Sequence, residues 1–272
     1  MTPAEAVPIL ERAVTWVTAF SIFILLLLEA AVPRTANVPT SNEKNRHTVR
    51  NAALWATGAL IGWSLAAGIP SATTWWESLA LNGSGLWLPL SAQLVVAVLV
   101  IDLSEYWRHR LFHRASALWL VHVVHHSDPA VDVTTGLRFH PLETIFVYAL
   151  RIALMVGLGL PVWALAVHAL VQIPVSALEH AAIRLPARFE PLAGWLIVTP
   201  AMHRVHHSRL RSETDSNYGE LFSFWDRLFG TYSPPSRASG GGMGVSALTA
   251  DSWQTTFGML LTPLHARSIK QF

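Results

Sequence analysis

The chain contains no cysteine, and this absence excludes several kinds of site. Without thiols it has no disulfide bond, no thiolate zinc site, no cysteine-bound iron–sulfur cluster and no cysteine nucleophile. Charged side chains are also scarce, because Asp, Glu, Lys and Arg make up 13% of the 272 residues, about half the share found in soluble domains. The formal net charge is +2, which is too small to favour a nucleic-acid partner.

Hydrophobic residues are abundant instead, at 52% of the chain, and 12 of them are tryptophans, which favour bilayer interfaces. Five apolar segments approach the length that crosses a bilayer. They are residues 13–32, 51–69, 86–104, 143–159 and 161–179. Arg151 lies in the fourth segment and would be costly in lipid. We therefore expect an all-α, multi-pass integral membrane bundle of four to five spans.

The first apolar segment predicts a membrane span and not a cleaved signal sequence. The residues before it contain one base, Arg12, against Glu5 and Glu11, so the basic region of a signal sequence is missing. The last two segments are separated only by Leu160, with Gly159 and Pro161 on either side, which predicts a tight helical hairpin or one kinked re-entrant pair.

Loop charges predict the orientation of the bundle. Segment 33–50 holds four basic residues and one acid, whereas segment 70–85 holds no base. The positive-inside rule therefore places 33–50 in the cytoplasm. Following the spans from there puts residues 180–272 on the cytoplasmic side, where we expect a helical cap. The compact chain without a retention tail favours a bacterial inner membrane.

Eight of the 13 histidines fall in three five-residue windows. The windows read His109-Arg-Leu-Phe-His113, His122-Val-Val-His-His126 and His203-Arg-Val-His-His207. Residues three and four apart share one face of a helix, so each window would point two or three imidazoles in one direction. All three windows fall on the predicted cytoplasmic side. They predict a metal centre that is assembled from separate elements.

The spacing around the windows predicts how the chain must run. One stripe continues from the third apolar segment into the first window, and it consists of Asp102, Tyr106, His109 and His113. A stripe of ionisable groups next to a membrane span must face an interior. His113 and His122 would point in opposite directions on one straight helix, so the chain must bend between Arg114 and Leu118. Thr199-Pro200 predicts a helix start before the third window.

The number of imidazoles bears on the metal. A structural zinc site needs only four ligands, so eight predict two ions. Calcium and magnesium prefer oxygen ligands, while zinc, iron, copper and nickel accept imidazole. The His-Glu-x-x-His motif of zinc proteases is absent, because Arg110 follows His109. This pattern fits oxygen chemistry on a lipid better than hydrolysis, and the alternatives are a zinc-dependent membrane lipid hydrolase and a non-enzymatic metal-binding membrane protein.

Other polar residues are weaker candidates. Asp102 is expected to orient a metal-bound imidazole, and Glu143 is expected to pair with Arg138. His140 suits the metal site and a hydrogen bond at a helix start equally well, and His180 favours the site. Three further histidines are expected outside the site: His168 as a hydrogen-bonded core residue, and His47 and His265 as solvated loop residues.

Taken together, the motifs resemble the fatty acid hydroxylase/sterol desaturase superfamily of integral-membrane di-iron enzymes. The resemblance covers roughly residues 95–235 and rests on several stretches. These are Asp102-Leu-Ser-Glu-Tyr-Trp-Arg-His-Arg-Leu-Phe-His113, Leu118-Trp119, His122-Val-Val-His-His-Ser127, Arg138-Phe-His-Pro-Leu-Glu143, Thr199-Pro-Ala-Met-His-Arg-Val-His-His-Ser208, Asn217-Tyr-Gly219 and Trp225-Asp-Arg-Leu-Phe-Gly-Thr-Tyr232. It divides the chain into N-terminal transmembrane helices (1–94), a catalytic domain (95–235) and a C-terminal tail (236–272).

The resemblance implies a di-iron centre, with zinc as a substitute, that activates O₂ and oxidises a C–H bond of a fatty acyl, sterol, carotenoid or related lipid. The implied iron ligands are His109, His113, His122, His125, His126, His203, His206 and His207. His140 and His180 match further histidines that are ligands or neighbours of the site in many members. Many members also carry an asparagine two positions after His180, where this chain has Ala182.

The electrons for such a reaction must come from a partner. The sequence contains no haem motif and no dinucleotide-binding fingerprint, so we expect an external electron-transfer protein or reductase. Arg204, Arg209 and Arg211 are the expected docking residues for an acidic carrier. The other expected partners are the lipid substrate, O₂ and the membrane. The sequence predicts neither the substrate nor the oligomeric state.

Overall fold

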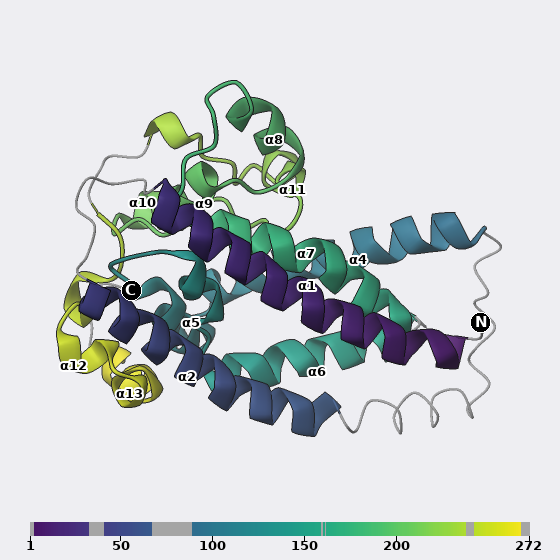
Figure 1. The fold of residues 1–272 in the computed structure, drawn as a ribbon, viewed down its shortest axis with the longest axis horizontal. Coiled ribbons are helices and arrows are strands. Elements are labelled where there is room, and N and C mark those ends of the chain that lie inside the picture. Colours follow the sequence, from purple (N-terminus) through teal and green to yellow (C-terminus); the bar gives the residue numbers. More distant parts are fainter. Residues whose placement is uncertain are drawn as a thin grey trace.

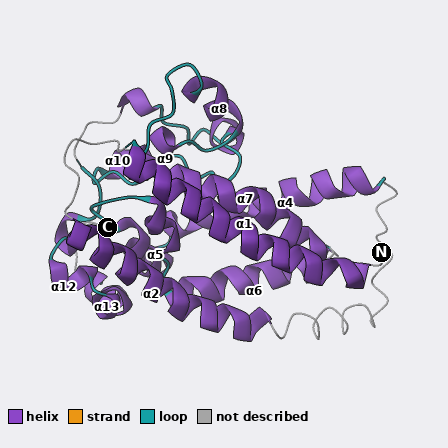
Figure 2. Ribbon diagram, viewed as in Figure 1, coloured by secondary structure: helices purple, strands orange, loops and turns teal. Residues whose placement is uncertain are grey.

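A computed structural model of the protein describes residues 3–32, 41–66, 89–158, 160, 162–237 and 242–267. Within these ranges the chain forms α-helices and short 3-10 helices, and the extended pairings found there are two isolated bridges (Figure 2). The predicted all-α class is confirmed for this part of the chain.

In the part of the chain that the structure describes, five long helices run roughly along one direction (Figure 1). They are α1 (Pro3–Ala31), α2 (Ser41–Ala66), α4 (Leu90–Arg114), α6 (Pro141–Leu158) and α7 (Val162–His180). Each overlaps one of the five predicted apolar segments. Helices α1 and α4 pack against α7, and α2 packs against α6. The two segments on either side of Leu160 are therefore separate helices.

Two of the described helices are long and apolar enough to cross a membrane. They are Pro8–Ala31 within α1, and α6. The count of four to five spans stays a prediction. The orientation does too, because segment 70–85 lies outside the described residues.

Short helices cover the end of the bundle where α1 ends and α2 begins, and two of them, α8 and α11, project to one side (Figure 1). The short elements are α5 (Ser116–His126), η1 (Val133–Leu137), α8 (Glu190–Leu196), α9 (Pro200–His206), α10 (Arg211–Thr214), α11 (Phe224–Leu228), η2 (Pro235–Arg237), η3 (Ser246–Leu248), α12 (Asp251–Gln254) and α13 (Thr256–Ala266).

Two helix boundaries that the histidine windows require are present. Ala115 is extended, with φ −95° and ψ 114°, and it separates α4 from α5. The predicted bend after Arg114 is therefore confirmed. Thr199 caps α9, because its side chain accepts a hydrogen bond from the Met202 N–H, and Pro200 occupies the first helical position. The predicted helix start before the third window is also confirmed.

Buried polar side chains tie the long helices to the histidine-bearing end. Glu29 of α1 is 3% exposed and accepts hydrogen bonds from the backbone N–H groups of Val133 (2.8 Å) and Ala182 (2.7 Å). Arg138 is fully buried and donates to Ser127 Oγ and Gln254 Oε1. An unpaired charge at these positions would be costly, so both contacts fix how the elements meet.

The prediction that His47 and His265 are solvated loop residues is wrong. His47 lies in α2, and its ring sits 2.9 Å from Asp128 Oδ2 and 3.3 Å from Asp132 Oδ2. His265 lies in α13 and stacks on Trp253 with 4.1 Å between ring centroids. Spacing along the sequence gave no sign of these acidic and aromatic neighbours, which come from distant segments.

Residues 236–244 contain the run Gly240-Gly241-Gly242, a composition that predicts a flexible connection. Residues 238–241 lie outside the described part of the chain. Met243, just after them, pairs with Ser208 in one isolated bridge and accepts a 2.7 Å hydrogen bond from Arg209 Nε through its carbonyl oxygen. The segment from Met243 onward is thus fixed against the end of α9. The predicted domain boundaries stay predictions.

Candidate metal centre

Nine buried histidines form two adjacent groups. The five-histidine group consists of His109, His113, His122, His126 and His206, and the four-histidine group consists of His125, His180, His203 and His207. Within each group, one nitrogen from every ring lies within 4.8 Å of the corresponding nitrogens of the others. All nine side chains are at most 6% exposed. The structure thus brings together all eight window histidines and adds His180.

Helical spacing explains how two helices supply both groups. In α5, His122 and His126 lie one turn apart and join the five-histidine group, while His125 turns towards the other group. In the third window, His203 and His207 join the four-histidine group and His206 joins the five-histidine group. The groups therefore lie side by side, and the rings of His126 and His207 are 4.6 Å apart.

In the five-histidine group, partners outside the group hold three Nδ1 atoms. His109 Nδ1 lies 2.9 Å from the Tyr218 carbonyl oxygen, and His206 Nδ1 lies 2.7 Å from that of Ser216. His122 Nδ1 lies 2.8 Å from Glu143 Oε1. The Nε2 atoms of the same three rings have no hydrogen-bond partner among the described residues. A neutral imidazole that donates from Nδ1 keeps the Nε2 lone pair free, which is the form that binds a metal.

In the four-histidine group, the Nε2 atoms point at one another. His180 Nε2 lies 3.2 Å from His125 Nε2 and 2.9 Å from His203 Nε2, and His207 Nε2 lies 3.0 Å from His203 Nε2. His180 Nδ1 is held by the Ser176 carbonyl oxygen at 2.7 Å. Four converging imidazole nitrogens form a donor set that suits a cation such as zinc, iron, copper or nickel. His180 lies among them, and its role as a metal ligand stays a prediction.

Four carboxylates of the described residues lie next to the groups, and no pattern in the sequence assigns them there. One is Glu220, whose Oε1 lies 3.8 Å from His109 Nδ1. Besides Glu143, Asp215 Oδ1 lies 3.5 Å from His113 Nδ1, and buried Glu179 lies 3.6 Å from His180 Nδ1. Glu179 also lies 3.9 Å from His203 Nδ1. Carboxylates in this position orient imidazole ligands and raise their basicity.

The structure corrects the expected roles of Asp102 and Glu143. Asp102 Oδ2 accepts hydrogen bonds from Trp225 Nε1 (2.8 Å) and the Phe222 N–H (3.2 Å). It therefore fastens the 222–225 segment to α4. The predicted Glu143–Arg138 ion pair is wrong, because Glu143 bonds to His122 whereas Arg138 binds residues of other segments.

Two candidate histidines lie outside both groups. His140 accepts a hydrogen bond from the Leu142 N–H at the start of α6, and its Nε2 lies 3.3 Å from the Leu260 carbonyl oxygen. It therefore acts at a helix start. His168 is buried, with Nε2 3.6 Å from Asp102 Oδ1, as expected for a core residue with a polar partner.

Charge around the groups is balanced by buried ion pairs. Arg108 lies 2.6 Å from Glu105 and 3.6 Å from Glu143, and it also contacts Glu220. Arg151, which the sequence marked as costly in lipid, lies 2.9 Å from Glu105. A charged side chain in a membrane helix is tolerated when it finds such a partner.

Burial keeps the imidazoles neutral. Loss of hydration lowers the pKa of His206 from the ordinary 6.5 to about 3. Burial, followed by the neighbouring rings, lowers the pKa values of His126, His203 and His207 well below 6.5. Neutral imidazole is the ligand form, so these rings are ready to bind a cation at pH 7.

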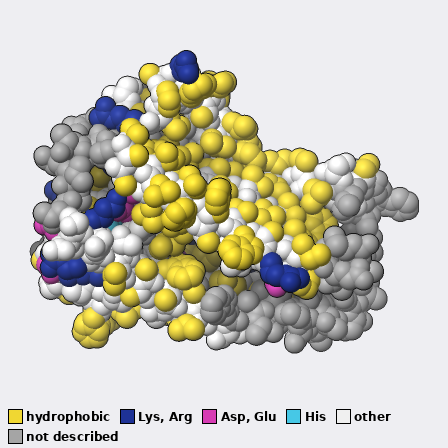
Figure 3. All heavy atoms as spheres, viewed as in Figure 1, with side chains coloured by type: hydrophobic (Ala, Val, Ile, Leu, Met, Phe, Trp, Pro, Cys, Tyr) yellow, Lys and Arg dark blue, Asp and Glu magenta, His cyan; other side chains and the backbone are white. Residues whose placement is uncertain are grey.

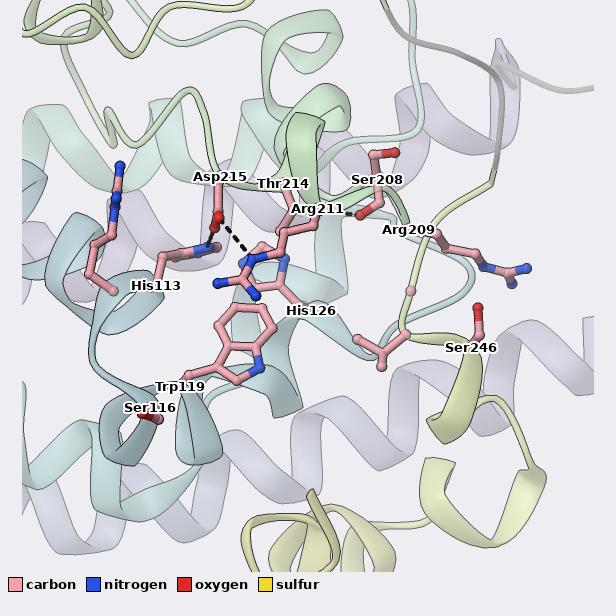
Figure 4. Close-up of a pocket in the computed structure, with 13 residues that line it drawn as sticks. His113, Ser116, Trp119, His126, Ser208, Arg209, Arg211, Thr214, Asp215 and Ser246 are labelled. Atoms are coloured by element: carbon pink, nitrogen blue, oxygen red, sulfur yellow. Dashed lines mark hydrogen bonds and ion pairs between the residues drawn. The ribbon is translucent and has the colours of Figure 1, made fainter. Parts of the chain in front are cut away.

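A cavity of about 300 Å³ reaches the five-histidine group from the side of α10 (Figure 4). Among its lining residues are His113 and His126, and Asp215 and Arg211 extend towards these rings in the close-up. Trp119 packs against both histidines, with ring centroids 4.9 Å and 5.3 Å away. No member of the four-histidine group lines this cavity among the described residues. The two groups therefore differ in their access.

The described part of the chain is thus a helical scaffold with two adjacent groups of buried imidazoles that could hold metal ions. Residues 94–231 match the family model described as fatty acid hydroxylase, which covers just over half of the chain. The chain belongs to this family, as its motifs predicted. No solved structure matches the chain.

Curated relatives share this region. The chain is 36% identical over 166 residues to ornithine lipid hydroxylase OlsE of Rhizobium tropici, covering 60% of this chain and 48% of that protein. It is 33% identical over 134 residues to alkylglycerol monooxygenase of Xenopus tropicalis, a match that covers 49% of this chain and 29% of that protein. It is 26% identical over 164 residues to lathosterol oxidase of Rattus norvegicus, a match that covers 57% of this chain and 50% of that protein. The chain thus spans half or less of these relatives, whose names all denote oxidation of a lipid.

Proposed function

We propose that this protein is a membrane-bound oxidoreductase that uses O₂ and two iron ions to hydroxylate or desaturate a C–H bond of a lipid. The observation that carries the proposal is the pair of adjacent histidine groups. Four of their rings bind outside partners through Nδ1 and turn Nε2 towards the other histidines: His109, His122, His180 and His206. The lipid-oxidising names of the relatives support the reaction class.

Each histidine group would hold one ion. The five-histidine group would bind through His109, His113, His122, His126 and His206, and the four-histidine group through His125, His180, His203 and His207. When bound, the two ions supply the redox chemistry by which O₂ oxidises an unactivated C–H bond. The donor set consists of imidazoles without thiolates, and the relatives are oxidases and oxygenases, so iron is favoured over zinc.

The contributions of the chain itself are positioning and charge balance. Glu143 and the Tyr218 and Ser216 carbonyl groups fix the tautomers of three rings and aim Nε2 inward. Arg108 balances the charge of Glu143 beside them. Burial of all nine rings excludes bulk water from the reacting region, which protects a strong oxidant from side reactions.

The proposed setting is a membrane crossed by the long helices, with the histidine groups on the cytoplasmic side of a bacterial inner membrane. Two apolar helices, α1 and α6, support the membrane assignment. The basic residues of 33–50 support the orientation. We propose that two or all three of α2, α4 and α7 also cross the membrane, which brings the total to four or five spans.

Electrons would reach the site from an external carrier on the cavity side. Arg209 and Arg211 are exposed and line the cavity, which suits an acidic partner. Arg204 is only partly exposed and does not line the cavity, and it donates to the Val131 carbonyl oxygen and to Met243 Sδ. The docking residues are therefore two of the three that the sequence suggested.

The test is a search for an O₂-dependent lipid product. Membranes containing the protein or its His207→Ala variant are incubated with a reductant and ¹⁸O₂, and the extracted lipids are compared by mass spectrometry. We expect a lipid that gains labelled oxygen, or loses two hydrogens, only with the unmodified protein and O₂. A product that forms equally without O₂ would contradict the proposal and favour a zinc-dependent hydrolase.

A further inference from the structure

A cluster of large apolar side chains lies exposed on the projection that α8 and α11 form. The members are Phe189 (48% exposed), Leu192 (73%), Trp195 (66%), Leu196 (57%) and Leu228 (66%), and we call them the α8–α11 patch. Single exposed apolar residues are ordinary, but five together are a candidate binding surface.

The patch sits on a rigid support. Ser223 Oγ donates a 2.8 Å hydrogen bond to the Gly194 carbonyl oxygen, and Ile197 and Phe222 form an isolated bridge. Gly194 is buried, and a Cβ there would lie 3.5 Å from Met202 Sδ, so α8 already packs its inner face against α9. The exposed side chains are therefore an outer face, and not a core that awaits closure.

Basic side chains border this face and stack on its rings. The guanidinium group of Arg188 lies 4.7 Å from the Phe189 ring centroid, and that of Arg227 lies 4.5 Å from the Trp195 ring centroid. Arg184 is exposed nearby. Arginine and tryptophan at the edge of an apolar face are typical of elements that lie in a bilayer interface, where the charge reaches the headgroups.

The only acid between residues 184 and 196 turns inward. Glu190 accepts a hydrogen bond from the Thr199 hydroxyl and is only partly exposed. The rim of the patch is therefore positive. This charge suits the anionic headgroups of a cytoplasmic leaflet.

The patch is continuous with the apolar surface of the long helices. Helix α1 exposes Phe20 (66%), Phe23 (58%) and Leu27 (52%). In the space-filling view the hydrophobic surface runs from the long helices onto the projection without a polar break (Figure 3). The same surroundings that cover α1 would therefore cover the patch.

We propose that the α8–α11 patch lies in the interfacial layer of the membrane that the long helices cross, with Arg184 and Arg188 against anionic headgroups. Continuity with α1 and the basic rim favour lipid over a protein partner. The inference rests on the membrane setting given under the proposed function and does not depend on which metal the protein binds.

Contact between the α8–α11 patch and the membrane would also influence the position of α9, which carries part of the candidate metal centre. The segment that leaves α8 enters α9 at Thr199, and α9 carries the third histidine window. Glu190 of α8 accepts a hydrogen bond from the hydroxyl of Thr199, which caps α9. A bilayer that holds α8 would therefore hold the start of α9 as well.

The lack of cysteine makes a labelling test direct. Leu192→Cys provides a single thiol on the patch, and Ala247→Cys in η3 provides a matched thiol at an exposed site away from it. Each full-length variant is labelled with bimane and placed in nanodiscs that hold one chain, with phosphatidylglycerol brominated on its acyl chains. We expect quenching about threefold stronger at position 192 than at 247, because an interfacial side chain reaches the acyl boundary. Equal quenching at both positions would overturn the proposal.

Two further measurements test the same proposal. A Leu228→Cys label on α11 should be quenched as strongly as the label at 192, and quenching of the 192 label should fall when Arg184 and Arg188 are both replaced by Glu. Aqueous iodide gives one more check on the label at position 192. If iodide quenches this label in nanodiscs with one chain but not in nanodiscs with two chains, the patch is a contact between two copies and the proposal is wrong. A variant that loses native secondary structure by circular dichroism is replaced by the second labelling position.

Discussion

The orientation of each imidazole depends on side chains and carbonyl groups from other parts of the chain. Glu143 is the clearest case, because this buried carboxylate holds His122 Nδ1 at 2.8 Å. Replacing Glu143 by Gln removes the charge that raises the basicity of the ring. We expect metal affinity to fall roughly 10- to 100-fold, which is the usual cost of losing such a partner. Titration with a competing chelator measures it.

Asp102→Asn is the matched control for that substitution. Asp102 is also a buried carboxylate, but it binds Trp225 and the Phe222 backbone. We expect Asp102→Asn to lower the unfolding temperature and to leave metal affinity nearly unchanged. Equal losses of affinity in both variants would mean that Glu143 has no specific effect on His122.

Acid should destabilise the metal-free protein. Folded His206 has a pKa of about 3, whereas an unfolded histidine has a pKa near 6.5. Between these values the unfolded chain binds more protons, so the stability present above pH 6.5 is lost as the pH falls. Glu220 acts in the opposite direction, because burial raises its pKa to about 7 from 4.5. His47 does so too, because Asp128 and Asp132 outweigh its burial and raise its pKa to about 10. The nine histidines of the two groups, whose pKa values burial lowers, are expected to outweigh these two residues.

The measurement is thermal unfolding of chelator-treated protein in detergent at a series of pH values. We expect the unfolding temperature to fall steadily from pH 7 to pH 5. A constant or rising unfolding temperature over this range would contradict the assignment of neutral, buried imidazoles.

Sequence spacing identified the eight window histidines, because three- and four-residue intervals directly predict a shared helix face. It did not identify their orienting partners. Glu143 and Asp215 come from α6 and from the loop after α10, and no local pattern links them to His122 or His113. The sequence did not separate His140 from His180 for the same reason. His140 precedes the fourth apolar segment and His180 follows the fifth, and only tertiary packing places one of them in a group.

Helix caps decide whether the histidine-bearing helices start in the right place. Thr199 caps α9, and Thr255 caps α13 through the same kind of contact with a backbone N–H. Replacing either threonine by Val should cost about 1 kcal/mol of unfolding free energy. Only Thr199→Val should also lower the metal bound, because α9 carries His203 and His206 whereas α13 carries no group member. Equal metal content in the two variants would contradict this role of α9.

The long helices and two breaks were predictable from the sequence, and the short helices were not. Apolar runs marked the long helices, and the break at Ala115 followed from the need to aim two windows at one site. Helices such as α8, α10 and α11 are seven residues or shorter. Their contacts with other elements stabilise them, so periodicity gives almost no sign of them.

The N-terminal helix is part of the fold that holds the site. Glu29 of α1 accepts from the N–H groups of Val133, in η1, and Ala182, just after His180. Glu29→Ala leaves both donors buried without a partner, at a cost of about 1–3 kcal/mol each. We expect a lower unfolding temperature and loss of metal from the four-histidine group.

Glu11→Ala tests the same helix without that contact, because Glu11 is exposed. It should leave both properties unchanged. If Glu29→Ala behaves like Glu11→Ala in unfolding temperature and metal content, α1 does not support the site.

The membrane class was predictable from composition because it depends on the total shares of apolar and charged residues in the chain. The number of spans was not, because it depends on how each helix meets lipid.

The metal content of the purified protein tests the two-group centre most directly. The full chain is purified without oxygen in detergent, and metals are counted per chain for the unmodified protein and for His207→Ala. We predict about two iron ions per chain, with a sharp loss in the variant, because His207 belongs to the four-histidine group. A well-folded protein without bound metal, or with two zinc ions that persist after growth in iron-rich medium, would contradict the di-iron centre.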